Sequence, residues 1–160
     1  MYYPVTLVTL RPFALSDVST VEPWLCAPGL SLPAGRASRE WPQRLLADRR
    51  IIAEIAEAAG QRIGFVRLDC GPDLVAELTL VVAPEHRRRG LGSRMFEAAL
   101  RLARQRRLRR LVALVDPTND PALAFFAEVG FEPDGLVGDR VRLARMVHAG
   151  DHQQPLDVEV

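Results

Sequence analysis

The sequence predicts a single α/β (α+β) domain, in which short strands form one sheet and helices pack on it. The first observation is the stretch 74–115, where an apolar strand, a helix and a fully apolar strand follow one another, as in a buried parallel pair. The second is the alternation of apolar and polar residues near the start of the chain, which is typical of a strand. The third is a length of 160 residues with 48% hydrophobic content, which suits one sizeable core. We expect one domain over 1–150 and a polar tail at 151–160.

The first 50 residues are expected to form one strand and two short helices. Ser16 or Asp17 precedes a helix-forming stretch and is a candidate N-cap, while Ser38 holds the same place before a second such stretch. Pro42 suits the first turn of the second helix, where its missing N–H is not needed. The elements expected here are a strand at 5–11, a helix at 18–25, a loop at 26–37 and a helix through 44–47.

The middle of the chain predicts a hairpin followed by a central strand. The stretch 51–58 is ambiguous, because its Ala and Glu residues favour a helix while its Ile residues favour a strand. We choose a strand, since residues 60–62 then form a turn into the apolar stretch 63–68. A second turn at 71–73 leads into the central strand at 74–82.

The last third of the chain alternates helices and strands. A glycine follows the last predicted helix, as is common at helix ends. The elements expected here are a main helix at 92–107, a buried strand at 111–115, a helix at 121–129, and final strands at 131–133 and 140–147.

The turn between the central strand and the main helix carries the strongest functional signal. Gly90 and Gly92 permit a tight turn and leave bare backbone N–H groups at the start of a helix. The partial positive charge of that helix end favours an anion. Three arginines, Arg87, Arg88 and Arg89, precede the glycines. The sequence therefore predicts a binding site for a pyrophosphate or a comparable polyanion.

Two familiar phosphate motifs are excluded by the residues themselves. A P-loop needs a lysine after its last glycine, but Ser93 follows Gly92, and all 21 basic residues of the chain are arginine. A dinucleotide fingerprint needs a third Gly or Ala three residues after the second, where this chain has Met95.

Two segments together resemble one protein family. The spacing Arg87-x-x-Gly90-x-Gly92 after a strand resembles motif A of the GCN5-related N-acetyltransferases, the GNAT superfamily. The segment 119–131 resembles the family's N-x-x-A-x-x-φ-Y-x-x-x-G-F pattern and lies downstream by one helix and one strand, as the family order requires. The resemblance implies the GNAT fold, a central mixed and mostly antiparallel sheet of six to seven strands with about four helices. It also implies a splayed parallel pair of strands at the cofactor site.

The resemblance further implies acetyl-CoA as co-substrate, with its arm in the gap between the splayed strands, and no metal. Backbone groups of the central strand would face the pantetheine amides, and the N–H groups of the turn would face the pyrophosphate. Arg87 is expected to brace this turn. The cofactor-binding residues implied in this way are Leu80, Val81, Val82, Arg87, Arg88, Arg89, Gly90, Leu91, Gly92, Ser93, Asn119 and Phe126.

Two carboxylates are candidates for the catalytic base that would accept the proton of an attacking amine. The first is Glu77 on the central strand, where the family often has a carboxylate; the alternative is a surface residue at a strand end. The second is Asp116, which alternatively forms a turn with Pro117. Asn119 alternatively caps the last helix. Phe126 departs from the family pattern, because the tyrosine usual there protonates the leaving thiolate.

The resemblance implies an acetyl-CoA-dependent N-acetyltransferase acting by direct attack on a primary amine, of a small molecule or of a peptide or protein N-terminus. The absence of the tyrosine keeps open a non-catalytic acyl-CoA sensor. A nucleic-acid-binding protein is a third class, suggested by the arginines at 101–110, but a net charge of +1 argues against it.

The remaining features of the chain point to a cytoplasmic protein. Cys26 and Cys70 have no metal-binding or redox spacing, so we expect free thiols in a reducing compartment. We expect neither a secretory signal nor a membrane span, because no apolar run has the length required. Family members often dimerise, which makes a homodimer a possible assembly.

Overall fold

A computed structural model describes residues 6–26, 40–87 and 90–148. Within these ranges the chain forms one seven-stranded sheet in the order β1-β2-β3-β4-β5-β7-β6, with four α-helices. Only the β4–β5 pair is parallel, which confirms the predicted mixed and mostly antiparallel sheet. The strands are β1 (Thr9–Pro12), β2 (Ile51–Ala58), β3 (Gln61–Cys70), β4 (Val75–Val82), β5 (Arg110–Val115), β6 (Glu132–Val137) and β7 (Arg140–Met146). The helices are α1 (Val18–Leu25), α2 (Trp41–Ala47), α3 (Leu91–Gln105) and α4 (Asp120–Glu128).

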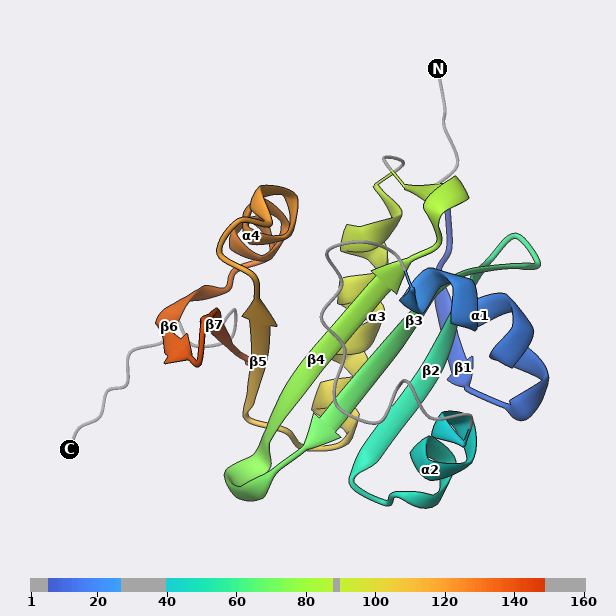
Figure 1. Cartoon of the computed structure of the whole chain (residues 1–160), viewed down its shortest axis with the longest axis horizontal. Helices are drawn as coiled ribbons and strands as arrows, with labels where there is room; N and C mark the ends of the chain where they lie inside the picture. The colour runs from blue at the N-terminus through green and yellow to red at the C-terminus, as the bar shows by residue number, and fades with distance from the viewer. Residues whose placement is uncertain (1–5, 27–39, 88–89, 149–160) are drawn as a thin grey trace.

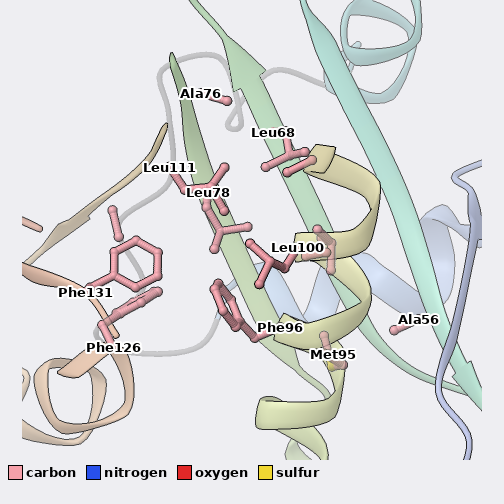
Figure 2. Close-up of a cluster of buried hydrophobic side chains, with 14 of the residues drawn as sticks. Ala56, Leu68, Ala76, Leu78, Met95, Phe96, Leu100, Leu111, Phe126 and Phe131 are labelled. Atoms are coloured by element: carbon pink, nitrogen blue, oxygen red, sulfur yellow. The ribbon is translucent and has the colours of Figure 1, made fainter. Parts of the chain in front are cut away.

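The helices cover the two faces of the sheet and create two cores (Figure 1). Residues of one strand alternate between these cores, because successive side chains of a strand point to opposite faces. Phe65 of β3 and Val81 of β4 pack with the residues of α1 and α2, whereas Leu68 and Leu78 pack with those of α3. Figure 2 shows the larger core, where Met95, Phe96 and Leu100 of α3 gather with Leu78, Leu111, Phe126 and Phe131.

The strand chosen for 51–58 is confirmed by β2. Ala59 and Gly60 connect it to β3 with φ of 51° and 77°, the two positive φ angles of a two-residue hairpin turn. The turn therefore comes one residue earlier than predicted, because Gln61 already pairs with Ala58. Of the helices in the described ranges, none is long and apolar enough to cross a bilayer.

Several predicted boundaries differ from the structure. β1 begins at Thr9 rather than residue 5, and α3 ends at Gln105 because Arg107 has a φ of 60°, outside the helical region. β6 extends to Val137 instead of ending at 133, because the next strand folds back along it. Most of the predicted loop at 26–37, the Ser38 cap and the tail at 151–160 lie outside the described residues.

Of the two N-cap candidates, Asp17 stands at the N-cap of α1, but its side chain makes no capping hydrogen bond and holds a buried ion-pair network instead. Its two oxygens accept hydrogen bonds from both terminal nitrogens of Arg11, at 2.8 and 2.9 Å, and from the Ala14 N–H at 2.9 Å. Arg62 Nε lies 3.0 Å from Oδ1. The Asp17 side chain is fully buried, and the hydrogen bonds from Arg11 hold its pKa below the ordinary value. The network ties α1 to β1 and β3.

We expect Asp17→Ala to destabilise the fold by about 1–3 kcal/mol, less than a fully buried pair would lose, because both arginines remain about one-third exposed. A lowered folded-state pKa gives stability that is present above the unfolded-state pKa of about 3.9 and is lost as the pH falls below it. Chemical denaturation at pH 7 and at pH 3 measures both effects.

The matched control is Asp48→Ala, which removes an aspartate whose partner Arg50 is well exposed. Exposed ion pairs contribute little, so this variant should unfold nearly as the wild type does. If Asp17→Ala kept wild-type stability at both pH values, the network would not have the structural role assigned to it.

Candidate active site

The parallel strands β4 and β5 separate after only three residue pairs. The pairs are Val75 with Arg110, Ala76 with Leu111, and Glu77 with Val112. Beyond them β4 stays paired with β3 as far as Val82, and β5 stays paired with β7 through Val115. Figure 1 shows the two strands diverging towards α4. The structure thus has the splayed parallel pair that the family resemblance implied.

A narrow cleft of about 90 Å³ lies between the separated strands. Phe126 contributes to its wall from α4 and is itself packed edge-on against Phe131, with ring centres 5.0 Å apart. The cleft combines apolar walls with polar groups at its rim, as a site for an amphipathic arm requires. Its lining residues are Glu77, Leu78, Thr79, Leu80, Ala113, Leu114, Val115, Asp116, Asn119, Ala122 and Phe126.

The turn from β4 into α3 lies at the end of β4. Arg87 Nε donates a hydrogen bond to the Val82 carbonyl oxygen at 3.2 Å, so Arg87 does brace the turn. Gly90 stands at the N-cap with a φ of 74°, the left-handed conformation that favours glycine. Gly90 has no side chain to cap the N–H groups of the first turn of α3, so this helix start is suited to bind an anion. Arg88 and Arg89 lie outside the described residues.

Gly92 is needed for a different reason, the close approach of α3 to its neighbours. A Cβ at this position would lie 3.2 Å from the Phe125 ring and 3.7 Å from a methyl group of Val82. Leu91 is buried, whereas Gly92 and Ser93 are partly exposed. The start of α3 is therefore held against the end of β4 and against α4.

Glu77 is half-buried and lines the cleft. It lies on the same face of β4 as Thr79 and Val81, opposite the face that packs on α3. Burial raises the pKa of its carboxyl, and the charge of Asp69, directly across the β3–β4 pair, raises it further. Arg140 and Arg67 oppose this rise. A carboxylate with a raised pKa is a better proton acceptor near neutral pH than an ordinary one.

Asp116 and Asn119 have the local roles that we gave as alternatives. Asp116 Oδ1 accepts hydrogen bonds from the N–H and the hydroxyl of Thr118, at 2.8 and 2.7 Å. These bonds lower the pKa of the exposed Asp116 carboxyl, which makes it a weaker base than Glu77. Asn119 Oδ1 accepts from the Ala122 N–H at 3.2 Å and caps α4. Its side-chain amide still lies at the cleft.

The sequence analysis missed two charged residues near Glu77. Asp69 lies opposite Glu77 because the turn at 71–73 sets the β3–β4 register, so counting back from that turn would have found it. Arg140 comes from β7, more than 60 positions along the chain, and no local pattern marks it. Its position depends on β7 pairing with β5.

A larger and more open hollow of about 850 Å³ lies elsewhere, lined by Arg11, Thr20, Glu57, Gly60, Gln61, Arg62, Glu85 and His86. Its arginines are already engaged: Arg11 bonds Asp17 and Glu57, and Arg62 contacts Asp17 and Thr20. These contacts stabilise the fold, and they leave the cleft between β4 and β5 as the better candidate site. Within the described ranges, no three His, Cys, Asp or Glu side chains are grouped to hold a metal ion.

Comparison with known proteins agrees with this geometry. An N-acetyltransferase of Methanocaldococcus jannaschii, itself uncharacterized, is 29% identical over 100 residues, which cover 58% of this chain and 44% of the relative. A putative [ribosomal protein bS18]-alanine N-acetyltransferase of Bacillus subtilis is 30% identical over 86 residues, covering 51% of this chain and 54% of the relative. This chain thus spans about half the length of these curated relatives.

Solved structures show the same fold at low sequence identity. A variant of the spermidine N-acetyltransferase SpeG from Vibrio cholerae matches with a TM-score of 0.79 at 18% identity, covering 91% of this chain and 97% of that chain. AAC(6')-Ib in complex with paromomycin and acetyl-CoA matches with a TM-score of 0.76 at 19% identity, covering 93% and 98%.

The family model for the acetyltransferase (GNAT) family matches residues 20–131, which include the splayed strands, the turn into α3 and the whole of α4. Sequence family, fold and cleft therefore agree, and the chain belongs to the GNAT acetyltransferase family.

Proposed function

We propose that this chain is an acetyl-CoA-dependent N-acetyltransferase that transfers an acetyl group to a primary amine by direct attack in a ternary complex. The observation that carries the proposal is the separation of β4 from β5 beside the glycine-capped start of α3. The gap offers an extended slot along the second half of β4, and the start of α3 offers an anion site just beyond the end of that strand. Acetyl-CoA has the matching parts, an amide-bearing arm and a pyrophosphate.

The binding step uses mostly backbone groups. The N–H groups of Gly90, Leu91, Gly92 and Ser93 would hold the pyrophosphate, and the edge of β4 from Leu80 to Val82 would pair with the pantetheine amides as an added strand does. The cleft fits this assignment, because it is narrow and has Leu80 on one side and Phe126 on another.

The chemical step requires a neutral amine. An ordinary ammonium has a pKa of about 10.4, so about one molecule in two thousand is neutral at pH 7. Glu77 is the base we assign to remove the proton, because it lies at the cleft and its pKa is raised. The neutral nitrogen then attacks the thioester carbon, and a backbone N–H near Val81 or Val82 stabilises the oxyanion. The C–S bond breaks as the oxyanion collapses, and the second proton of the attacking nitrogen passes to solvent, which leaves the amide and the coenzyme A thiolate.

Departure of the thiolate needs no acid from Phe126. A coenzyme A thiol resembles a cysteine, with a pKa of about 8.5, and is a moderate leaving group without protonation. Phe126 instead keeps the wall of the cleft apolar, since its ring packs against Phe125 and Phe131.

We expect calorimetric titration to show micromolar binding of acetyl-CoA, and Gly90→Trp to weaken it about tenfold or more by covering the N–H groups of α3. Gly60→Trp is the matched control, because Gly60 has nearly the same φ, 77° against 74°, and equally open surroundings, but lies in the β2–β3 turn. Both variants should lose similar stability, about 1–2 kcal/mol. Absence of binding by folded wild type, or equal weakening by both variants, contradicts the site.

We expect Glu77→Gln to lower kcat by about 10²–10⁴-fold while the affinity for acetyl-CoA stays the same. In the wild type, activity should fall as the pH decreases through the raised pKa of Glu77, above the ordinary value of about 4.3. This acidic limb should be absent from the residual activity of the variant. Steady-state rates of coenzyme A release, recorded from pH 9 down through the ordinary carboxyl pKa, measure both.

Asp69→Asn gives the complementary test. It removes a negative charge that raises the pKa of Glu77, so the acidic limb of the wild-type profile should move to lower pH. Glu97→Gln, an exposed change on α3, should leave the profile in place. If the acidic limb of the pH–rate profile stayed unchanged in both Glu77→Gln and Asp69→Asn, the base would have to be another group.

A second candidate function is a non-catalytic sensor of acyl-CoA. It is suggested by Phe126, which has no hydroxyl to protonate the leaving thiolate. Such a protein would bind acetyl-CoA with the same dependence on Gly90 but release no coenzyme A in the presence of amines. Release of coenzyme A with any amine of a broad panel rules the sensor out.

A further inference from the structure

Arginine residues are concentrated where α3 ends and the chain continues into β5. Residues 91–110 make up one-eighth of the chain, yet they hold seven of its 21 basic residues and only one acidic residue, Glu97. We use the name arginine patch for the five of these arginines that are exposed, which are Arg101, Arg104, Arg106, Arg107 and Arg109. A net charge of +1 argues against a protein covered with positive charge, but it does not exclude such a local surface.

The arginine patch has no acidic counterpart. Within the ranges that the structure describes, none of its five side chains forms an ion pair, and Glu97, one turn before Arg101 on α3, makes none with it either. The dipole of α3 favours a cation in the last turn of the helix, which accounts for Arg104. It does not account for Arg107 and Arg109, because they lie beyond the end of the helix. The patch is thus left with uncompensated positive charge.

Arg107 occupies a position that suits glycine better. Its φ is 60°, in the left-handed region that side chains disfavour. The Arg107 N–H donates to the Arg104 carbonyl oxygen and the Leu108 N–H donates to the Ala103 carbonyl oxygen, both at 3.0 Å. These two bonds form a Schellman motif, in which glycine is the usual residue at the position of Arg107. Neither the local fold nor an ion pair therefore explains an arginine here.

The backbone holds the arginine patch at the opposite end of α3 from the proposed pyrophosphate site. The Arg109 N–H donates to the Leu74 carbonyl oxygen at 2.7 Å, and the Arg109 carbonyl oxygen accepts from the Val147 N–H at 2.9 Å. Arg110 then pairs with Val75, the first residue of β4, whereas the start of α3 follows the other end of β4 (Figure 1). A helix of 15 residues spans about 22 Å, so the two surfaces are separate.

The arginine patch fits a chain of phosphates. A guanidinium binds a phosphate through two parallel hydrogen bonds, and nucleic acids present phosphates at short, regular spacing. A lipid bilayer fits less well, because a surface that enters it needs exposed apolar side chains. No large hydrophobic side chain is exposed within 91–110, all of which the structure describes. Of the exposed ones near it, Met146 lies on the face of the sheet opposite Leu143 and α3, which leaves Leu74 alone.

We propose that the arginine patch is a nucleic-acid-binding surface that contacts the phosphate backbone and does not read the base sequence. This binding goes beyond the acetyl transfer proposed above and does not depend on it. Because the patch and the start of α3 lie at opposite ends of the helix, nucleic acid and acetyl-CoA bind at the same time.

Fluorescence anisotropy with labelled oligonucleotides tests the proposal. The probes are a uridine RNA of about 20 nucleotides and a DNA duplex of about 20 base pairs, each with and without saturating acetyl-CoA. We expect a micromolar Kd at about 50 mM salt and no effect of acetyl-CoA on it. For about five phosphate contacts, the Kd should rise about ten- to twentyfold between about 50 and 100 mM salt, because bound counterions are released. The probe that binds more tightly shows whether RNA or DNA supplies the phosphates.

Arg107→Gly is the sharpest variant, because it removes a charge at a position that favours glycine. It should weaken binding about tenfold at about 50 mM salt and lower the salt slope by about one contact. Its melting temperature should be unchanged or higher, so misfolding cannot explain the loss. Arg104→Gln should weaken binding to a similar extent. Arg44→Gln is the control of equal charge, because Arg44 is an exposed arginine of α2 paired with Glu40, and it should bind as the wild type does.

Three results would overturn the proposal. The first is no binding of either oligonucleotide at about 50 mM salt, including the case in which phosphatidylglycerol vesicles bind instead and the patch variants lose them. The second is equal weakening by Arg107→Gly, Arg104→Gln and Arg44→Gln. The third is competition by acetyl-CoA, which would place the nucleic acid on the start of α3.

Discussion

The site depends on the early end of pairing between β4 and β5. Each strand is fully paired on its outer edge, β4 with β3 and β5 with β7, so neither can move to close the gap without losing that ladder. Backbone groups on the facing edges beyond Glu77 and Val112 have no strand partner among the described residues. Leaving such groups unpaired costs about 1–3 kcal/mol each when they are buried. A ligand with amides along an extended arm would satisfy them.

The gap is maintained by aromatic packing beneath it. Phe96 of α3 and Phe126 of α4 both pack against Phe131, with ring centres 5.6 and 5.0 Å apart. These rings fill the space below the separating strands, as Figure 2 shows, and join α3 to α4. β4 then supplies three elements of the site at once: an edge for the arm, a face with Glu77, and an end that leads into the turn before α3.

The local parts of this arrangement could be predicted from the sequence. β2 followed from its Ile residues and the glycine after it, and the turn before α3 followed from Gly90 and Gly92, because those residues impose a backbone conformation. The N-cap position of Asp17 could be predicted, but its ion pairs could not, because Arg11 and Arg62 meet it only in the folded sheet. Arg140 was missed for the same reason. The environment of Glu77 depends on strand register and on β7, which no short pattern encodes.

Amide hydrogen exchange is the most direct measurement of the central claim, that the separated edge of β4 binds the arm of acetyl-CoA. The account predicts that saturating acetyl-CoA slows exchange in residues 78–82 and 90–93, while β2, which has partners on both sides, stays unchanged. Tight binding of acetyl-CoA without added protection in 78–82 would contradict the account, because the ligand would then lie outside the gap between β4 and β5.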